Sequence, residues 1–173
     1  QLIAAGFAAR QMDFPFLGLY GACSTMAESL IVGSMAIDAG FAQRVACCVT
    51  SHFSTAERQY RTPLELGTQR TPTAQRTVTG AGASVLAGEG IGPRIKSCTI
   101  GKVIDYGVKD ANNMGAAMAP AAADTIYNYL TDFDVAPDSF DAIVTGDLGI
   151  YGSNLLKEML AEKGYDLRGV ARD

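Results

Sequence analysis

The stretch "GLYGACSTMAESL", residues 18–30, guides the fold prediction because an apolar segment passes through a small-residue turn into an apolar helix. Gly21 and Ala22 allow a tight turn, and Cys23 stands where the unpaired N–H groups of the new helix favour a thiolate. Two interpretations of Cys23 follow: a reactive nucleophile, or an inert cysteine in an apolar context. A nucleophile also needs a base that takes and returns its proton.

The segments around this stretch predict a mixed α/β domain. Residues 14–20 are typical of a short strand, and residues 24–39 of an apolar helix that is buried on most faces and ends at Gly40. Residues 44–51 form a β-branched, apolar run of strand length. A strand, a helix and a strand of this size predict a βαβ unit with a parallel pair.

The rest of the chain predicts further strands and two more helices. We expect strands at 77–88, 95–104 and 141–146, a helix with Pro120 near its first turn that runs to about Leu130, and a helix with Ser153 as its N-cap and Gly164 as its C′ residue.

Composition narrows the class of protein. The 173 residues, 48% of them hydrophobic, suit one globular domain, and the net charge of −4 argues against general affinity for nucleic acid or an anionic membrane. The apolar runs are too short to cross a bilayer, so any membrane association is peripheral, and we find no signal-peptide pattern. Four cysteines without CxxC spacing favour reduced thiols. The chain opens at Gln1 in mid-pattern, which predicts a fragment.

The loop at 52–76 is a candidate ligand site because it concentrates basic residues in an acidic chain. Its charged residues are four arginines against two glutamates: Arg58, Arg61, Arg70, Arg76, Glu57 and Glu65. Guanidinium groups pair bidentately with carboxylates and phosphates, so the cluster predicts recognition of a small polyanion. A solvated loop or a subunit contact is the alternative.

His52, the single histidine, lies just past the strand at 44–51. In a parallel βαβ unit it would share one edge of the sheet with Cys23 and supply the missing base. A loop histidine without a catalytic role is the other interpretation.

Asp147 lies in "TGDLGIYGS", residues 145–153, which follows a predicted strand and precedes a predicted helix. This position belongs to the ligand-facing edge of a sheet, where Asp147 either binds or caps. No cluster has metal-ligand spacing, and Asp105, Asp110 and Asp147 would make only a weak calcium set.

The passage "LYGACSTMAESLIVGSMAIDAGFAQRVACCVTSHFSTAERQYR" resembles the thiolase superfamily, and "SHFSTAERQYRTPLELGTQRTPTAQRT" resembles a family of sporulation proteins within it. "TVTGAGASVLAGEG" matches the strand that closes the first half of such folds, and "FDAIVTGDLGIYGSNLLKEML" resembles a strand, loop and helix of the second half. The resemblance implies a layered αβαβα fold. Residues 1–90 would be the latter part of the N-terminal half and residues 91–173 the first part of the C-terminal half, so we expect an incomplete segment.

One departure from the superfamily bears on mechanism. Its condensing enzymes carry a catalytic histidine after the second-half strand, where this chain has Gly146 and Asp147. The resemblance therefore implies a non-catalytic protein that binds dipicolinic acid, pyridine-2,6-dicarboxylic acid, for uptake into the developing spore. Cys23 carries over as a pocket residue, and His52, Arg58, Arg61 and Asp147 are the further ligand-binding candidates.

The resemblance also implies partners and a location. We expect integral membrane proteins of the same sporulation transport system, a homodimer, no nucleic acid, and a peripheral position on the inner membrane of the forespore or spore. No cofactor is expected, apart from calcium accompanying dipicolinate. Two other functions stay open: acyl transfer that uses Cys23, and a structural subunit with a vestigial pocket.

Overall fold

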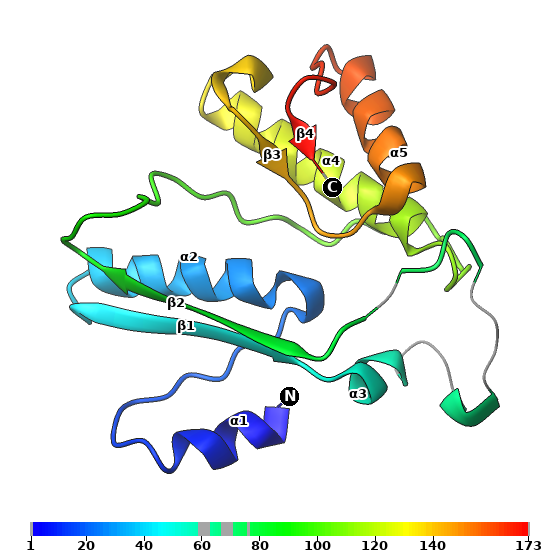
Figure 1. The fold of residues 1–173 in the computed structure, drawn as a ribbon. Coiled ribbons are helices and arrows are strands. Elements are labelled where there is room, and N and C mark those ends of the chain that lie inside the picture. Colours follow the sequence, from blue (N-terminus) through cyan, green and yellow to red (C-terminus); the bar gives the residue numbers. More distant parts are fainter. Residues whose placement is uncertain (1, 59–62, 67–70, 76, 173) are drawn as a thin grey trace. The chain divides into compact units, whose positions relative to one another are not determined.

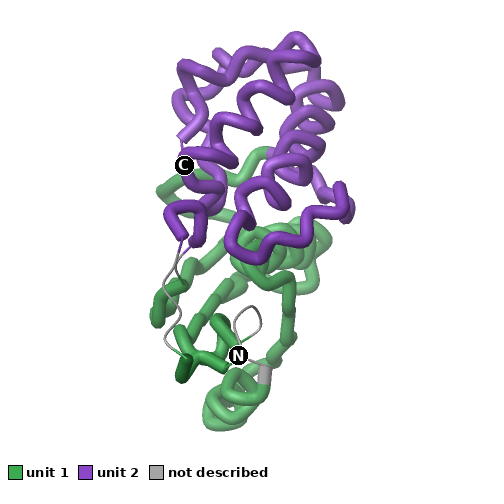
Figure 2. The backbone as a smooth tube through the Cα atoms, turned by 90° about the vertical axis from the view of Figure 1, so that its right-hand side faces the viewer, with its two compact units in different colours: residues 1–66, 77–96 green, residues 67–76, 97–173 purple. Residues whose placement is uncertain are grey.

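The computed structural model describes residues 2–58, 63–66, 71–75 and 77–172. Arg61, Arg70 and Arg76 of the predicted arginine cluster lie outside these described residues. The chain divides into two compact units (Figure 2). Unit 1 comprises residues 1–66 and 77–96, and unit 2 comprises residues 67–76 and 97–173.

Unit 1 is built around a helix and a two-stranded sheet (Figure 1). Its elements are α1 (Leu2–Ala9), η1 (Ala22–Ser24), α2 (Thr25–Asp38), β1 (Arg44–Ser51), α3 (Phe53–Glu57), η2 (Leu64–Leu66) and β2 (Gly80–Ala87), where η marks a 3-10 helix.

The sheet of unit 1 is antiparallel. β1 pairs with β2 from Arg44 opposite Ala87 to Ser51 opposite Gly80. The predicted strand at 44–51 is confirmed, but the parallel βαβ unit is wrong. Residues 14–20 form no strand, because no other described segment supplies the ladder of hydrogen bonds that a strand needs.

Helix α2 packs on this sheet through a glycine. A Cβ atom at Gly33 would lie 3.0 Å from Cys47 Sγ and 3.2 Å from Val45 Cγ1, so the missing side chain allows the close approach. The predicted helix is confirmed, and it ends before Gly40, whose φ is +77°. The expected burial on most faces is wrong: Met35 is 49% exposed, because among the described residues the sheet covers one face only.

Unit 2 consists of two helices packed on each other, with a very short parallel sheet. Its elements are α4 (Met114–Asp132), η3 (Pro137–Ser139), β3 (Ile143–Val144), α5 (Gly149–Glu162) and β4 (Ala171–Arg172), with β3 paired to β4. Its core is formed by Ala119, Ala123, Leu148, Leu156, Leu160, Leu167 and Ala171.

Both helices of unit 2 begin earlier than the sequence predicts. Helix α4 starts after Asn113, whose side chain accepts a hydrogen bond from the Ala116 N–H at 3.3 Å, so Pro120 lies inside the helix. Helix α5 starts at Gly149, which leaves Ser153 buried within it instead of capping it. The predicted end of α5 before Gly164, with φ +88°, is confirmed.

The predicted strands of unit 2 are mostly absent. Only residues 143–144 of the segment 141–146 form a strand, and residues 95–104 form none. Instead, the stretch 97–102 is held to α4 by side chains: Ser97 Oγ lies 2.7 Å from Tyr129 Oη, and Lys102 Nζ lies 3.2 Å from Asp124 Oδ1. Both units combine helices with small sheets, so the chain has a mixed α/β fold.

In the part of the chain that the structure describes, none of the helices has the length and apolar character that a membrane crossing requires.

Candidate functional site

Cys23 is exposed in a turn that the neighbouring side chains hold in place. It lies in η1, immediately before α2. The Gly21 N–H donates to Thr25 Oγ1 at 3.1 Å, and the Ser24 hydroxyl donates to the Gly21 carbonyl at 2.7 Å. Ala22 adopts a φ of +49°, a left-handed conformation that costs a non-glycine residue about 1 kcal/mol or more. The predicted tight turn into the helix is confirmed.

Glu28, in the first turn of α2, lies against this turn. A Cβ atom at Gly21 would lie 2.7 Å from Glu28 Oε2 and 2.5 Å from Ser24 Oγ, so any other residue there would require both side chains to shift. Glu28 Oε2 is buried and has no hydrogen-bond partner among the described residues. A carboxylate oxygen that is shielded from water therefore lies against the turn that contains Cys23.

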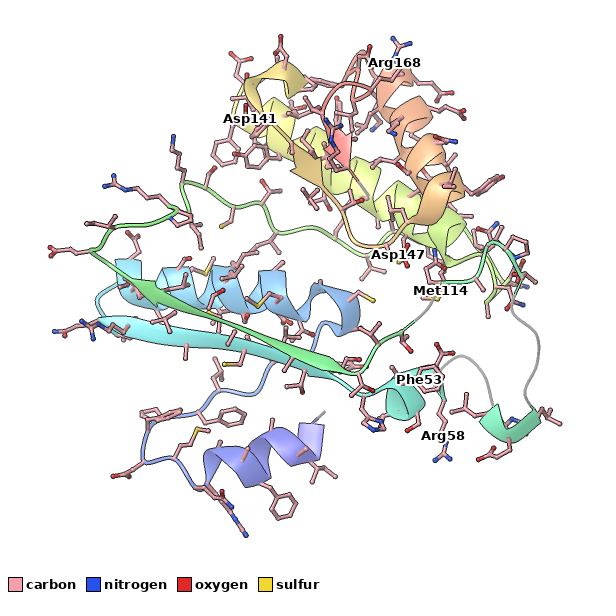
Figure 3. The ribbon with its side chains drawn as sticks, viewed as in Figure 1. Phe53, Arg58, Met114, Asp141, Asp147 and Arg168 are labelled. Carbon is pink, nitrogen blue, oxygen red and sulfur yellow. The ribbon has the colours of Figure 1, made fainter. Side chains whose placement is uncertain are left out.

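His52 and Arg58 flank α3, directly after β1. His52 is the N-cap residue, and its Nδ1 lies 3.0 Å from the Ser54 hydroxyl. Arg58 is the C-cap residue, and its Nη2 lies 3.2 Å from Glu65 Oε1 in η2. Figure 3 shows the Arg58 guanidinium directed away from α3. Both side chains are exposed.

Cys23 and His52 lie toward the same end of unit 1. The Cys47 thiol donates to the Ser29 carbonyl at 3.2 Å, and α2 and β1 run in opposite directions. Cys23 precedes Ser29 by six residues, about 9 Å of helix, and His52 follows Cys47 by five residues, about 16 Å of strand. His52 therefore lies farther than Cys23 from the Cys47–Ser29 contact, toward the same end of unit 1. Its described hydrogen-bond partner is Ser54.

Asp147 belongs to unit 2, in the exposed loop between β3 and α5 (Figure 3). The N-cap residue of α5 is Leu148, so Asp147 does not occupy the N-cap position of that helix. No three His, Cys, Asp or Glu side chains within the described ranges are grouped closely enough to hold a metal ion. Asp105 and Asp110 instead accept hydrogen bonds from the Gly107 and Asn112 N–H groups in tight turns.

Glu57 is a structural residue that the sequence did not reveal. Its side chain is 2% exposed and accepts hydrogen bonds from the Thr77 hydroxyl at 2.9 Å and the Thr77 N–H at 3.4 Å. The Phe53 N–H donates to Thr79 Oγ1 at 3.0 Å. These contacts hold α3 against the segment before β2. They therefore bring together the two ends of the loop at 58–76, which contains the arginines. A lone glutamate between Ala56 and Arg58 has no periodicity that predicts burial.

The cysteines differ enough in burial to predict selective modification. Cys23, Cys48 and Cys98 are exposed, whereas Cys47 is buried, and burial raises the pKa of its thiol. We expect iodoacetamide to alkylate Cys23 at least about tenfold faster than Cys47 in the folded protein, since the thiolate is the nucleophile. Site-resolved mass spectrometry measures both rates, and unfolding in urea should equalise them. Equal rates in the folded protein would contradict the packing of α2 on β1.

Comparison with known proteins connects this geometry to a family. Residues 1–173 match the family model described as stage V sporulation protein AD (SpoVAD). The chain is also 47% identical over 165 residues to the stage V sporulation protein AD of Bacillus subtilis (strain 168). That alignment covers 95% of this chain and 49% of the relative, so the chain spans about half the length of that relative.

Proposed function

The chain belongs to the stage V sporulation protein AD family and has a role in sporulation, and from this premise we propose that it binds dipicolinic acid without chemical turnover, for uptake into the developing spore. Pyridine-2,6-dicarboxylate is a small planar dianion. Guanidinium groups suit its two carboxylates, and an apolar pocket suits its ring.

The exposed Arg58 guanidinium carries this proposal. It extends from α3 at the end of β1, the end of unit 1 toward which the Cys23 turn also lies. Its Nη2 already contacts a carboxylate, that of Glu65, so the group is accessible to carboxylates in this conformation. Cys23, His52 and Arg61 are proposed as further ligand-binding residues, and Asp147, which belongs to unit 2, is proposed separately.

The proposal also covers the wider setting of the protein. It takes the family's complete chain to have a layered αβαβα, thiolase-like fold that forms homodimers. It places the protein peripherally on the inner membrane of the forespore or spore, beside integral membrane proteins of the same transport system. Gly146 and Asp147, where condensing enzymes of the thiolase superfamily carry a histidine, support binding without catalysis.

Replacing Arg58 tests the site. Arg58→Ala should weaken dipicolinate binding about tenfold, because it removes charge-assisted hydrogen bonds to a carboxylate, whereas Cys23→Ala should retain binding. Isothermal titration calorimetry measures both affinities. Arg44→Ala is the matched control, because it removes an exposed arginine at the opposite end of β1. Unchanged affinity in both Arg58→Ala and Arg61→Ala would remove the loop from the site.

Acyl transfer is the second candidate function, favoured by the exposure of Cys23 at the start of α2. An acyl thioester analogue that labels Cys23 covalently and is turned over would establish it and contradict the first proposal. A structural subunit with a vestigial pocket predicts tight association with the membrane partners and no dipicolinate binding.

A further inference from the structure

The two ends of α3 are held by one short segment that directly precedes β2. At the first residue of the helix, the Phe53 N–H donates to Thr79 Oγ1 at 3.0 Å. At the last residue, the Glu57 carboxylate accepts from the Thr77 hydroxyl at 2.9 Å. Val78, between the two threonines, is 70% exposed, which matches the alternation of side chains in an extended chain. Two threonines on one side of this segment therefore bond to both ends of the helix.

The spacing of the two threonines suits the length of α3. From Phe53 to Glu57 the helix rises about 6 Å, and two residues of extended chain span about 6.6 Å. Thr79 bonds to the start of α3 and Thr77 to its end, which is the antiparallel direction of β1 and β2. The two contacts thus continue the pairing of β1 with β2 beyond the ends of these strands.

Helix α3 carries Arg58 and is too short to hold its own shape. Fixing the first turn of a helix costs more free energy than its hydrogen bonds return. Within α3, the Ala56 N–H donates to the His52 carbonyl at 3.0 Å, and the Arg58 N–H donates to the Ser54 carbonyl at 3.2 Å. The backbone of Arg58 is therefore bonded to the first turn of the helix, and the position of that turn sets the position of Arg58.

We propose that Thr79 is a positioning residue for Arg58 in the dipicolinate site. The inference rests on the proposed function. A guanidinium group binds a carboxylate through hydrogen bonds of defined direction, so a helix that tilts freely presents Arg58 less often in the binding orientation. The Thr79 hydroxyl acts through α3, because it fixes the first turn of the helix whose C-cap residue is Arg58.

Thr79→Val tests this inference, because it removes the acceptor hydroxyl and keeps the β-branched shape of the side chain. Isothermal titration calorimetry should show dipicolinate bound about threefold less tightly, which is within the range for the loss of one hydrogen bond. Thr79→Ser, which keeps the hydroxyl, should bind as the wild type does. Thr50→Val is the matched control, because it makes the same substitution at an exposed threonine of β1.

A double-mutant cycle separates positioning of Arg58 from a general structural effect. In the Arg58→Ala background, Thr79→Val should cause little further loss of affinity, because the group that Thr79 positions is gone. An equal loss of affinity in both backgrounds would show that Thr79 acts on the fold in general and would overturn the inference.

The remaining outcomes separate this inference from the proposed function. If Arg58→Ala weakens dipicolinate binding while Thr79→Val binds as the wild type does, the positioning role is wrong and the binding function stands. A loss in Thr50→Val or Thr79→Ser as large as that in Thr79→Val would also overturn the positioning role. If the wild type binds no dipicolinate, both proposals fail.

Discussion

Gly115→Ala should destabilise unit 2 by about 2 kcal/mol, because the backbones of α4 and α5 touch at this residue. A Cβ atom at Gly115 would collide with the Leu148 carbonyl oxygen and lie 3.2 Å from Gly152 Cα. From the other side, a Cβ atom at Gly152 would lie 2.8 Å from Gly115 Cα. Alanine gains about 1 kcal/mol of helix propensity at most, which is less than the cost of forcing two backbones apart.

Thermal denaturation and hydrogen exchange of peptides from α4 and α5 measure this loss. Gly6→Ala is the matched control, because Gly6 lies in helix α1 and its Cβ atom would meet nothing within 4 Å. Gly152→Ala should be destabilising too, and the double variant should lose less than the sum, since both substitutions disturb one contact. If the Gly115→Ala variant has the thermal stability and the hydrogen-exchange rates of the wild type, the close contact between α4 and α5 at this residue is contradicted.

Glu57→Ala is the second substitution with a large expected effect. We expect it to destabilise unit 1 by roughly 1–3 kcal/mol, because Thr77 loses a buried hydrogen-bond acceptor for its hydroxyl and N–H groups. Glu57→Gln, which keeps an acceptor oxygen, should lose less. The base of the loop at 58–76 should also open in Glu57→Ala.

Limited digestion with trypsin detects this opening, because the loop contains four arginines: Arg58, Arg61, Arg70 and Arg76. Cleavage at these residues should accelerate in Glu57→Ala and stay at the wild-type rate in the exposed control Glu89→Gln. Chemical denaturation measures the stability of both variants. Unchanged stability and cleavage in Glu57→Ala would show that the Thr77 contact does not hold the loop.

Features encoded in neighbouring residues could be predicted from the sequence. The apolar run before Gly40 predicted α2, and β-branched residues predicted β1, because helix ends and strand runs are local signals. The antiparallel pairing of β1 with β2 depends on a partner more than 25 residues away, and no local pattern fixes it. The expected strands at 14–20 and 95–104 are absent because a strand also needs a partner.

The candidate site likewise has some features that the local sequence predicts and others that it does not. The turn at Cys23 and the position of His52 after a strand follow from local sequence. The burial of Glu57 and its contact with Thr77 do not, because they depend on how the chain returns after a 20-residue separation. The Gly115–Gly152 contact likewise joins two helices, and the sequence pattern of neither helix predicts its contact with the other.

The central claim is that the protein binds dipicolinic acid and leaves it chemically unchanged. Calorimetric titration of pyridine-2,6-dicarboxylate into the purified protein, followed by mass spectrometry of the ligand and of the protein, tests this claim most directly. We predict a saturable heat of binding, ligand recovered intact, and no adduct on Cys23. A folded protein that gives no saturable heat at millimolar ligand, or one that carries a covalent adduct on Cys23, would contradict the claim.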